Sequence, residues 1–304
     1  MTGHVQIVEV GPRDGFQSVG PIISTPDKID VINRLYGAGV RRMEATSFVS
    51  TKAVPQLADA GLIVEAVRGL SGLDAQVLIP TARYAEQALA SGATHLSAVL
   101  SVSEAHNLSN LRRTRAQSVS DIRDIVALLP ADGALRLNLA TAFDCPYDGR
   151  VPASQVCDLL AQLLAIAPRA EIALCDTTGR ADPAQVTELY SILGECFPDV
   201  SAWAFHGHDT YGLGSANAYA AWTAGVRVFD ASVAGLGGCP FAPGATGNVA
   251  TEDLVWMFDS MGYATGIRLA ELVDVALDVT ALPGSQTGGR VRNAILAGSC
   301  ANAR

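Results

Sequence analysis

The feature that most constrains the fold is an alternation that runs through most of the chain. Short runs rich in β-forming residues are each followed by a stretch with helical periodicity. We predict eight strands, at residues 5–10, 41–47, 75–79, 95–100, 135–140, 170–175, 202–206 and 227–232. The helical patterns between them lie at residues 26–37, 82–90, 118–128, 153–167, 183–197 and 214–223. Two of these helices begin with a proline signal, at Pro26 and Pro183.

Strands that alternate with helices indicate a parallel sheet, and about 250 residues is the usual size of a (β/α)8 barrel. We therefore expect an α/β fold, a single (β/α)8 TIM barrel, with a doubly wound open sheet as the structural alternative. The barrel would span about residues 5–262, with its last helix at 251–262. Residues 263–304 would form a C-terminal helical extension that includes a helix at 269–282, so that residues 1–304 make one domain.

Composition and charge exclude several classes of protein. The net charge of −9 argues against general nucleic-acid binding, which needs clustered cations. The six cysteines form no CxxC pair, which favours a reduced, cytoplasmic protein over a disulfide-bonded or zinc-knuckle one. No apolar run approaches the roughly 20 residues that a membrane span requires, so we expect no membrane association.

Polar and ionisable residues follow the predicted strands, where a parallel barrel gathers its chemistry. The first strand runs into residues 9–17 (EVGPRDGFQ), and the second ends in Glu44-Ala45-Thr46-Ser47. The sixth runs into Asp176, the seventh into His206-Gly207-His208, and the eighth into the glycine-rich residues 235–248. We therefore expect one site at the carboxyl ends of the strands.

The carboxyl ends of the strands form the mouth of a (β/α)8 barrel. The HxH pair, His206 and His208, predicts a metal site at this mouth. Residues i and i+2 of a strand point to the same face, so both imidazoles can approach one ion. Asp14 can supply a hard oxygen from the opposite arc, and Asn248 a carbonyl oxygen. Mixed nitrogen and oxygen ligands suit Mg²⁺ or Mn²⁺, but two histidines and a carboxylate also fit a non-haem iron oxygenase. Two hydrogen-bonded histidines without a metal are the plain structural alternative.

The glycine-rich run after the eighth strand carries Cys239. A dinucleotide-binding glycine motif should lie early in a βαβ unit and open directly into a helix, whereas this run contains Pro240 and Pro243. We interpret it as a long active-site loop. A cysteine beside a cation is a candidate proton donor or acceptor, because the cation favours the thiolate.

These segments resemble the hydroxymethylglutaryl-CoA lyases of the DRE-TIM metallolyase group. The resemblance runs from residues 8–15 (VEVGPRDG) to 251–254 (TEDL) and is most specific at residues 234–240 (AGLGGCP). Residues 44–50 (EATSFVS), 103–107 (SEAHN) and 145–149 (CPYDG) agree as well.

The resemblance implies a role for each matching residue. Asp14, His206, His208 and Asn248 would bind Mg²⁺ or Mn²⁺, Arg13 would stabilise an enolate, and Cys239 would protonate it. Glu44 and Asp176 would orient the metal site. The residues that would contact the acyl-CoA substrate are Gln17, Ser47, Lys52, His106 and Asn107. The implied reaction is retro-Claisen cleavage of 3-hydroxy-3-methylglutaryl-CoA into acetyl-CoA and acetoacetate, catalysed by a homodimer.

Several positions leave alternatives open. Residues 99–101 and 137–139, residues 143–144 and Gly207 depart from the best-known animal lyases, which allows a related substrate such as citramalyl-CoA or a longer-chain 3-hydroxyacyl-CoA. Isopropylmalate-synthase-like condensing enzymes share the barrel and the metal motif, but usually carry a long C-terminal regulatory domain. For the CoA phosphates, the candidates are Lys52, Arg112, Arg113 and Arg115. His106 and Asn107 could instead cap their own loop, and Cys300 lies where the animal enzymes carry a regulatory cysteine.

Overall fold

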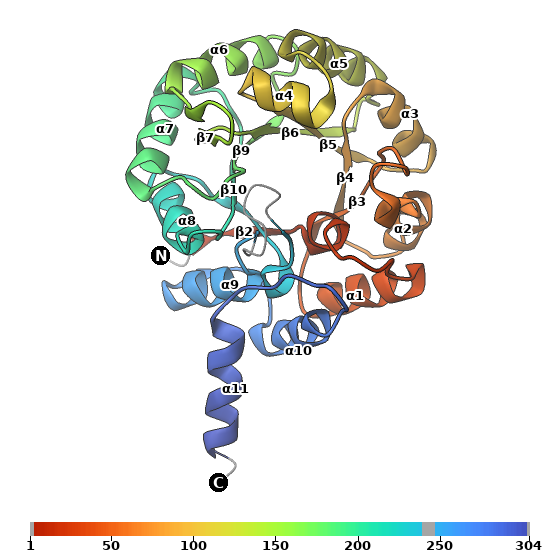
Figure 1. Cartoon of the computed structure of the whole chain (residues 1–304), viewed down its shortest axis with the longest axis vertical. Coiled ribbons are helices and arrows are strands. Elements are labelled where there is room, and N and C mark those ends of the chain that lie inside the picture. The colour runs from red at the N-terminus through yellow and green to blue at the C-terminus, as the bar shows by residue number, and fades with distance from the viewer. Residues whose placement is uncertain (1–2, 239–246, 303–304) are drawn as a thin grey trace.

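The centre of the molecule is a closed barrel of eight parallel strands (Figure 1). The computed structural model describes residues 3–238 and 247–302, with side chains described up to residue 298. Around the barrel the strands follow the order β10-β11-β2-β3-β4-β5-β6-β9. These strands are β2 (Gln6–Glu9), β3 (Arg42–Ser47), β4 (Asp74–Ile79), β5 (His95–Ser101), β6 (Ala134–Ala140), β9 (Glu171–Asp176), β10 (Trp203–Gly207) and β11 (Val228–Ala231). The predicted (β/α)8 barrel is confirmed, and the open-sheet alternative is wrong.

Helices form a ring around the barrel, and a C-terminal extension follows it (Figure 1). The ring consists of α1 (Thr25–Gly37), α2 (Ala60–Val67), α3 (Ala82–Ala90), α5 (Arg115–Leu128), α6 (Ala153–Leu164), α7 (Pro183–Cys196), α8 (Gly214–Thr223) and α9 (Thr251–Ser260). The short helix α4 (Glu104–Leu111) lies inside this ring, next to α5. The extension contains α10 (Leu269–Thr280) and α11 (Val291–Asn302), and α11 points away from the barrel. The sequence did not predict α2 or α4. Within the expected helical extension it named the helix at 269–282 but not α11.

The predicted proline signals mark real helix starts. Before α1, the Ser24 side chain accepts a hydrogen bond from the backbone N–H of Asp27, and before α7 the Asp182 carboxylate does the same for Gln185. In both helices proline occupies the first turn, where its missing N–H has no intrahelical partner to lose. Local chemistry therefore sets these two boundaries.

The main apolar core lies between the strands and the helices. The apolar cluster inside the barrel is smaller, and the barrel interior also holds polar side chains. Side chains alternate along each strand, so Phe205 and Phe229 face outward into the main core. A small separate cluster on the opposite face of the strands consists of Val8, Val10, Ala173, Ala204 and Val228. This leaves room in the barrel for charged side chains.

An ion-pair network lies inside the barrel, toward the amino ends of the strands. Arg42 pairs with both carboxylate oxygens of Glu171 at 2.8 Å, and Arg136 lies 3.3 Å from the same carboxylate. Arg136 also donates to both oxygens of Asp230, at 2.7 and 2.8 Å. Removing one partner of such a buried pair leaves an uncompensated charge, which typically costs about 3–5 kcal/mol. The network therefore fixes the inward-facing side chains beneath the mouth.

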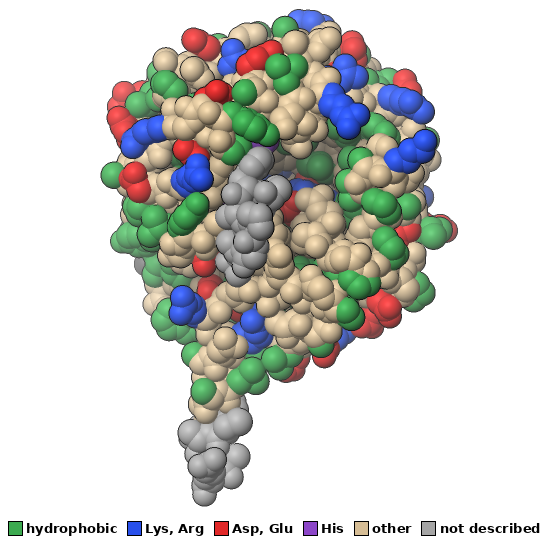
Figure 2. Space-filling model, viewed as in Figure 1, with side chains coloured by type: hydrophobic (Ala, Val, Ile, Leu, Met, Phe, Trp, Pro, Cys, Tyr) green, Lys and Arg blue, Asp and Glu red, His purple; other side chains and the backbone are tan. Residues whose placement is uncertain are grey.

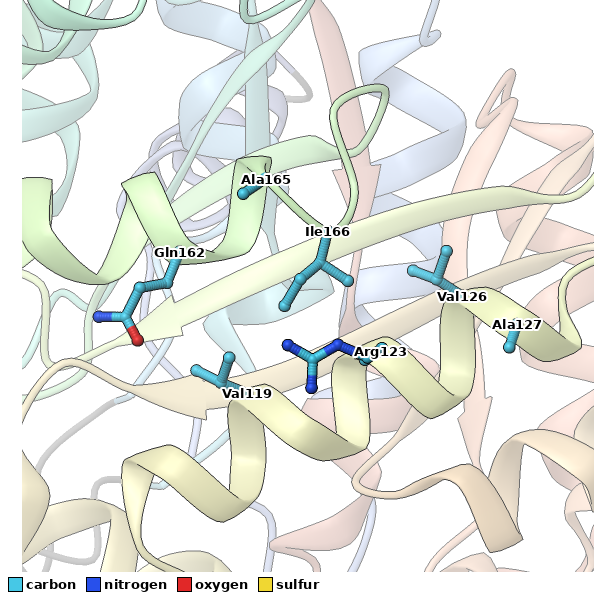
Figure 3. Close-up of a pocket in the computed structure, with 7 residues that line it drawn as sticks. All are labelled: Val119, Arg123, Val126, Ala127, Gln162, Ala165 and Ile166. Carbon is cyan, nitrogen blue, oxygen red and sulfur yellow. The ribbon is translucent and has the colours of Figure 1, made fainter.

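Smaller sheets and surface features complete the fold. β1 (Gly3–His4) pairs with β12 (Tyr263–Ala264), and β7 (Asp144–Cys145) with β8 (Gly149–Arg150). A surface hollow of about 610 Å³ lies on the outer wall between α5 and α6 (Figure 3). It is lined by none of the residues at the carboxyl ends of the strands. Among the described residues, no helix is both long and apolar enough to cross a membrane.

Candidate active site and metal centre

A π-helical turn, η1 (Gly11–Gly15), places Arg13 and Asp14 at the mouth directly after β2. The carbonyl of Val10 accepts hydrogen bonds from the N–H groups of Arg13, Asp14 and Gly15, at 3.1, 2.7 and 3.3 Å. Such widened turns occur frequently at functional sites, because they re-aim side chains that a regular helix would point elsewhere. The two consecutive side chains thus both reach the strand ends.

The HxH pair lies at the end of β10, opposite this turn. His206 and His208 are both buried, and their ring centroids lie 5.3 Å apart. Residues 247–249 run beside this strand end, with backbone hydrogen bonds from Asp209 to Gly247 and from Val249 to Gly207. This pairing sets Asn248 against His208. Elements distant in sequence therefore meet at one point.

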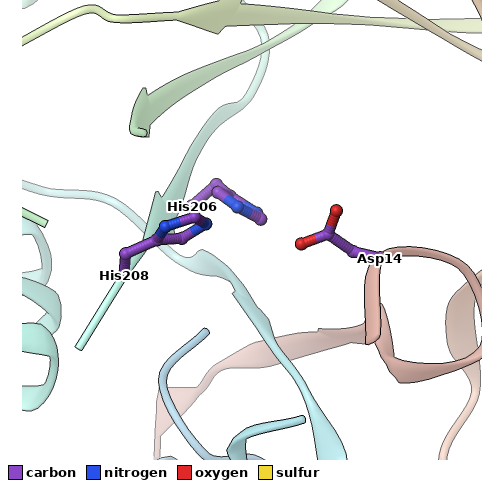
Figure 4. Close-up of side chains that lie close together, drawn as sticks. All are labelled: Asp14, His206 and His208. Atoms are coloured by element: carbon purple, nitrogen blue, oxygen red, sulfur yellow. The ribbon is translucent and has the colours of Figure 1, made fainter. Parts of the chain in front are cut away.

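Asp14, His206 and His208 form a cluster with metal-site geometry (Figure 4). One ligand atom from each residue lies within 4.8 Å of the other two. Within the described part of the chain, the buried Nδ1 of His208 has no hydrogen-bond partner. One carboxylate and two imidazoles together supply the mixed oxygen and nitrogen ligands that divalent cations accept. The donor set therefore fits a divalent ion.

Asn248 is the fourth candidate ligand, and its amide nitrogen faces Asp14. The nitrogen donates to the Asp14 carboxylate at 2.8 Å and to the carbonyl of Leu236 at 3.2 Å. In this conformation Asn248 holds Asp14 in place. Exchanging the amide nitrogen and oxygen would direct the oxygen toward the same region, as a metal ligand requires.

The charges of the cluster keep Asp14 ionised. Burial by itself would raise the pKa of Asp14, but Arg13 and the two histidines lower it to about 2. Burial and the neighbouring His206 lower the pKa of His208 to about 4, so its ring is neutral near neutral pH. A carboxylate and a neutral imidazole are the protonation states that metal ligation needs.

Asp230 lies beside His206 on the neighbouring strand β11 and orients its ring. Its carboxylate lies 3.0 Å from the Nδ1 atom of His206 and is itself held by Arg136. Burial would lower the pKa of His206, but the contact with Asp230 raises it. Histidine ligands of metals commonly carry such a carboxylate partner, which fixes the ring and its tautomer. The sequence interpretation missed Asp230 and Arg136.

Arg13 is held between two carboxylates. Its guanidinium contacts Glu44, at the mouth end of β3, and its own neighbour Asp14. The amide of Gln17 donates to Asp14 at 2.7 Å. Arg13, Asp14, Glu44 and Gln17 therefore form one connected group, and the arginine remains partly exposed to the mouth.

The other predicted site residues at strand ends are buried. Asp176 ends β9, and both its oxygens accept from the backbone N–H of Ala181, at 3.2 and 3.3 Å. Burial raises the pKa of Asp176 to about 7. Ser47 donates to the carbonyl of Leu78 at 3.0 Å. These contacts tie both side chains to the scaffold at the mouth.

The candidate substrate contacts fall into different surroundings. Asn107 accepts from the N–H of Ser101 and donates to Arg113 and Ser118, so its amide caps the loop after β5. His106 is buried, with Nδ1 2.7 Å from the hydroxyl of Ser101. Lys52 is exposed in the loop after β3. The geometry of Asn107 matches the loop-capping alternative.

Basic side chains gather on the rim of the mouth over α3, α4 and α5 (Figure 2). Beside them the face is hollowed, with acidic and basic atoms at the bottom of the hollow. Arg113 pairs with Asp121 at 3.1 Å, and Arg115 lies 3.6 Å from Glu104, while Arg112 ends α4. Cys239 and the side chain of Cys300 lie outside the described residues.

Comparison with known proteins defines the class to which this barrel and site belong. The model of the HMGL-like family matches residues 4–279. (R)-citramalyl-CoA lyase of Chloroflexus aurantiacus is 39% identical over 280 residues, which cover 88% of each chain. Mitochondrial hydroxymethylglutaryl-CoA lyase of Mus musculus is 38% identical over 292 residues, covering 96% of this chain and 89% of that one.

A solved structure agrees with these relatives. An HMG-CoA lyase from Acinetobacter baumannii, in complex with coenzyme A and 3-methylmalate, superposes with a TM-score of 0.89. It is 39% identical, and the match covers 96% of this chain and 95% of that one. The chain belongs to the HMGL-like family. It is an enzyme, a carbon–carbon lyase built on a (β/α)8 barrel.

Proposed function

We propose that this enzyme is a divalent-metal-dependent lyase that cleaves 3-hydroxy-3-methylglutaryl-CoA into acetyl-CoA and acetoacetate. The observation that carries the proposal is the convergence of Asp14, His206 and His208 beside Arg13 at the barrel mouth. The HMG-CoA lyases among its relatives support the choice of substrate.

Four residues would hold the cation, Mg²⁺ or Mn²⁺: Asp14, His206, His208 and Asn248. The short spacing of the three ligand atoms supports this assignment. When bound, such a cation lowers the pKa of a coordinated hydroxyl and polarises carbonyl oxygens. Glu44 and Asp176 would keep the surrounding side chains in place.

The residues of the chain would then carry out two proton transfers around the cleavage of one carbon–carbon bond. The tertiary hydroxyl of the substrate loses its proton to Asp14, and the oxygen's electron pair forms the ketone of acetoacetate. The carbon–carbon bond breaks, and its electrons form the enolate of acetyl-CoA. Arg13 stabilises the negative charge on the thioester oxygen, an interaction that is stronger in the transition state than in the substrate. Cys239 donates the proton that completes acetyl-CoA.

Gln17, Ser47, Lys52 and His106 are the proposed contacts of the acyl-CoA, and Asn107 is proposed to act through the loop that it caps. Purified protein of about twice the 31.6 kDa chain mass would support the proposed homodimer. Light scattering after gel filtration measures that mass directly, and a single-chain mass would contradict the dimer.

A second substrate is favoured by one relative. (R)-citramalyl-CoA lyase is 39% identical to this chain, and hydroxymethylglutaryl-CoA lyase is 38% identical, so identity does not separate citramalyl-CoA from the methylglutaryl analogue. The test is acetyl-CoA release with Mg²⁺ or Mn²⁺ from both thioesters and from longer-chain 3-hydroxyacyl-CoA esters. Cleavage of another ester without cleavage of 3-hydroxy-3-methylglutaryl-CoA would overturn the proposed substrate and keep the reaction class. Loss of activity on replacing iron with Mg²⁺, or oxygen consumption, would overturn the class itself.

A further inference from the structure

The chain between α10 and α11 crosses residues 233–238, the base of the glycine-rich loop (Figure 1). The N–H of Gly288 donates to the carbonyl of Ala234 at 2.8 Å, and the N–H of Gly237 donates to the carbonyl of Gln286 at 3.2 Å. Gly235 has a φ of +59°, and a Cβ there would lie only 3.0–3.2 Å from backbone atoms of Gly288. Position 235 therefore needs glycine. The close approach and the two hydrogen bonds hold residues 286–288 against the loop base.

A buried ion pair extends this contact to α11. Arg292 donates to one oxygen of Glu252 at 2.8 Å, and the other oxygen of Glu252 accepts from the N–H of Ala234 at 3.0 Å. Arg292 also donates to the carbonyl of Gly288 at 3.1 Å. Ala234 has a left-handed backbone, with φ of +60°, which is unfavourable unless surrounding contacts hold it. Arg292 holds both hydrogen-bond partners of Ala234, Glu252 and Gly288, and so supports those contacts indirectly.

The start of α11 is fastened separately. The carboxylate of Asp253 accepts from the backbone N–H groups of Arg290 and Val291, at 2.8–3.0 Å. Arg292 is therefore presented to Glu252 by a helix whose first turn is anchored to α9. Side-chain exposure is 7% for Arg292 and 0% for Glu252, so water screens this pair weakly.

The same loop base is linked to the turn that carries Arg13 and Asp14. One oxygen of Glu9 accepts from the N–H groups of Gly11, at 2.7 Å, and Val233, at 2.9 Å. A shift of residues 233–238 would therefore alter both the start of this turn and the position from which the chain enters Cys239. Displacements of about 1 Å at a catalytic group can cost about 100-fold in rate.

We propose that the segment 286–292 positions the loop that leads to Cys239, with Arg292 as its principal positioning residue. Arg292 acts through Glu252 and Ala234 and touches no reacting atom. The inference rests on the proposed function to the extent that Cys239 is the proton donor. The effect of Arg292 should appear in kcat and in the reactivity of the Cys239 thiol. Metal affinity should change less, through the link between the loop base and the turn that carries Asp14.

The test compares Arg292→Ala and Arg292→Lys with Arg290→Ala. Arg290 is exposed and contributes its backbone N–H to Asp253, so its alanine variant removes the same charge from the same segment. Three quantities are measured well below each variant's Tm: kcat, KM, and the rate at which iodoacetamide alkylates the Cys239-containing peptide in the substrate-free protein. We expect kcat of Arg292→Ala to fall about 10- to 100-fold with KM within about twofold. Alkylation should change several-fold, Arg292→Lys should recover part of both effects, and Arg290→Ala should behave as the parent protein.

Thiol alkylation separates this inference from the proposed function, because it needs no substrate. Unchanged alkylation and kcat in a folded Arg292→Ala variant with a lowered Tm would overturn the positioning role and leave only a contribution to stability. If Arg292→Ala does not fold, Arg292→Lys provides the test, because a lysine cannot make the same paired contacts. Parent-like kcat and alkylation in Arg292→Lys would then overturn the positioning role of Arg292. A parent protein that cleaves no 3-hydroxyacyl-CoA would instead refute the proposed function.

Discussion

Replacing Asp230 with asparagine tests how the barrel interior controls the candidate metal centre. The carboxylate lies between Arg136, at 2.7 and 2.8 Å, and Nδ1 of His206, at 3.0 Å. An ionised carboxylate can only accept, so Nδ1 must carry the proton and Nε2 is left with a lone pair for a cation. Asparagine can donate as well as accept, so it no longer selects this tautomer.

The expected loss of metal affinity follows from that change. Mutating the partner of a histidine ligand typically costs 10- to 100-fold in metal affinity, about 1.4–2.8 kcal/mol. The effect on stability should be smaller than for a broken buried pair, because Arg136 keeps Glu171 at 3.3 Å and the amide oxygen can still accept from it. We expect a loss of about 1–3 kcal/mol in the free energy of unfolding.

The assay is calorimetric titration of the metal-free protein with Mn²⁺, supported by NMR of the imidazole nitrogens to read the tautomer of His206. Asp74→Asn is the matched control, because Asp74 also joins an arginine to a histidine, with Arg42 at 3.0 Å and His95 at 2.7 Å. That trio lies at the amino ends of the strands, where the control should leave Mn²⁺ affinity unchanged. Parent-like Mn²⁺ affinity in a folded Asp230→Asn protein would refute the reasoning.

Three further outcomes follow from the site. Arg13→Lys should lower kcat about 100- to 1000-fold while Mn²⁺ affinity survives, because lysine lacks the planar fork; near-parent kcat would contradict the role of Arg13. Cys239→Ser should lower kcat about 100-fold or more with KM little changed, in steady-state assays of acetyl-CoA release, and an active serine variant would remove the cysteine from the mechanism. Burial raises the pKa of Glu9 from 4.5 to about 7, so the unfolded chain loses this proton first as the pH rises. The contribution of Glu9 to stability should therefore decline between about pH 4.5 and 7, by about 3 kcal/mol, and then level off. Glu9→Gln, which keeps the arrangement of the protonated acid, should gain stability relative to the parent across that window in urea titrations, and a constant difference would contradict the shift.

The sequence predicted the barrel well because its signals are local and repeated. Each strand is a short apolar run beside a helix with a recognisable start, as at Ser24 and Asp182. The helix α2 escaped prediction because its sequence, AGLIVEAV, is apolar on nearly every face and shows no polar stripe. The helix α4 is short and mostly polar, so it lacks the apolar stripe that marks a helix.

The site was partly predictable for the same reason. The placement of polar residues at strand ends indicated that Asp14, Glu44, His206 and His208 would share one mouth. Asp230 carried a usable signal, a charged residue inside an apolar strand, but its partner depends on strand register: β10 and β11 pair His206 with Asp230 directly. The contacts of Arg292 with Glu252 join the C-terminal helix to α9, and no spacing in the sequence encodes them.

The π-helical turn after β2 has a consequence for how this family can change. Arg13 and Asp14 are neighbours in a turn that holds one residue more than a regular α-helical turn. Deleting a single residue there would rotate everything beyond the deletion by about 100° around the turn's axis. A substitution changes one side chain and its direct contacts, whereas a change in the length of this turn would misplace both Arg13 and Asp14 together.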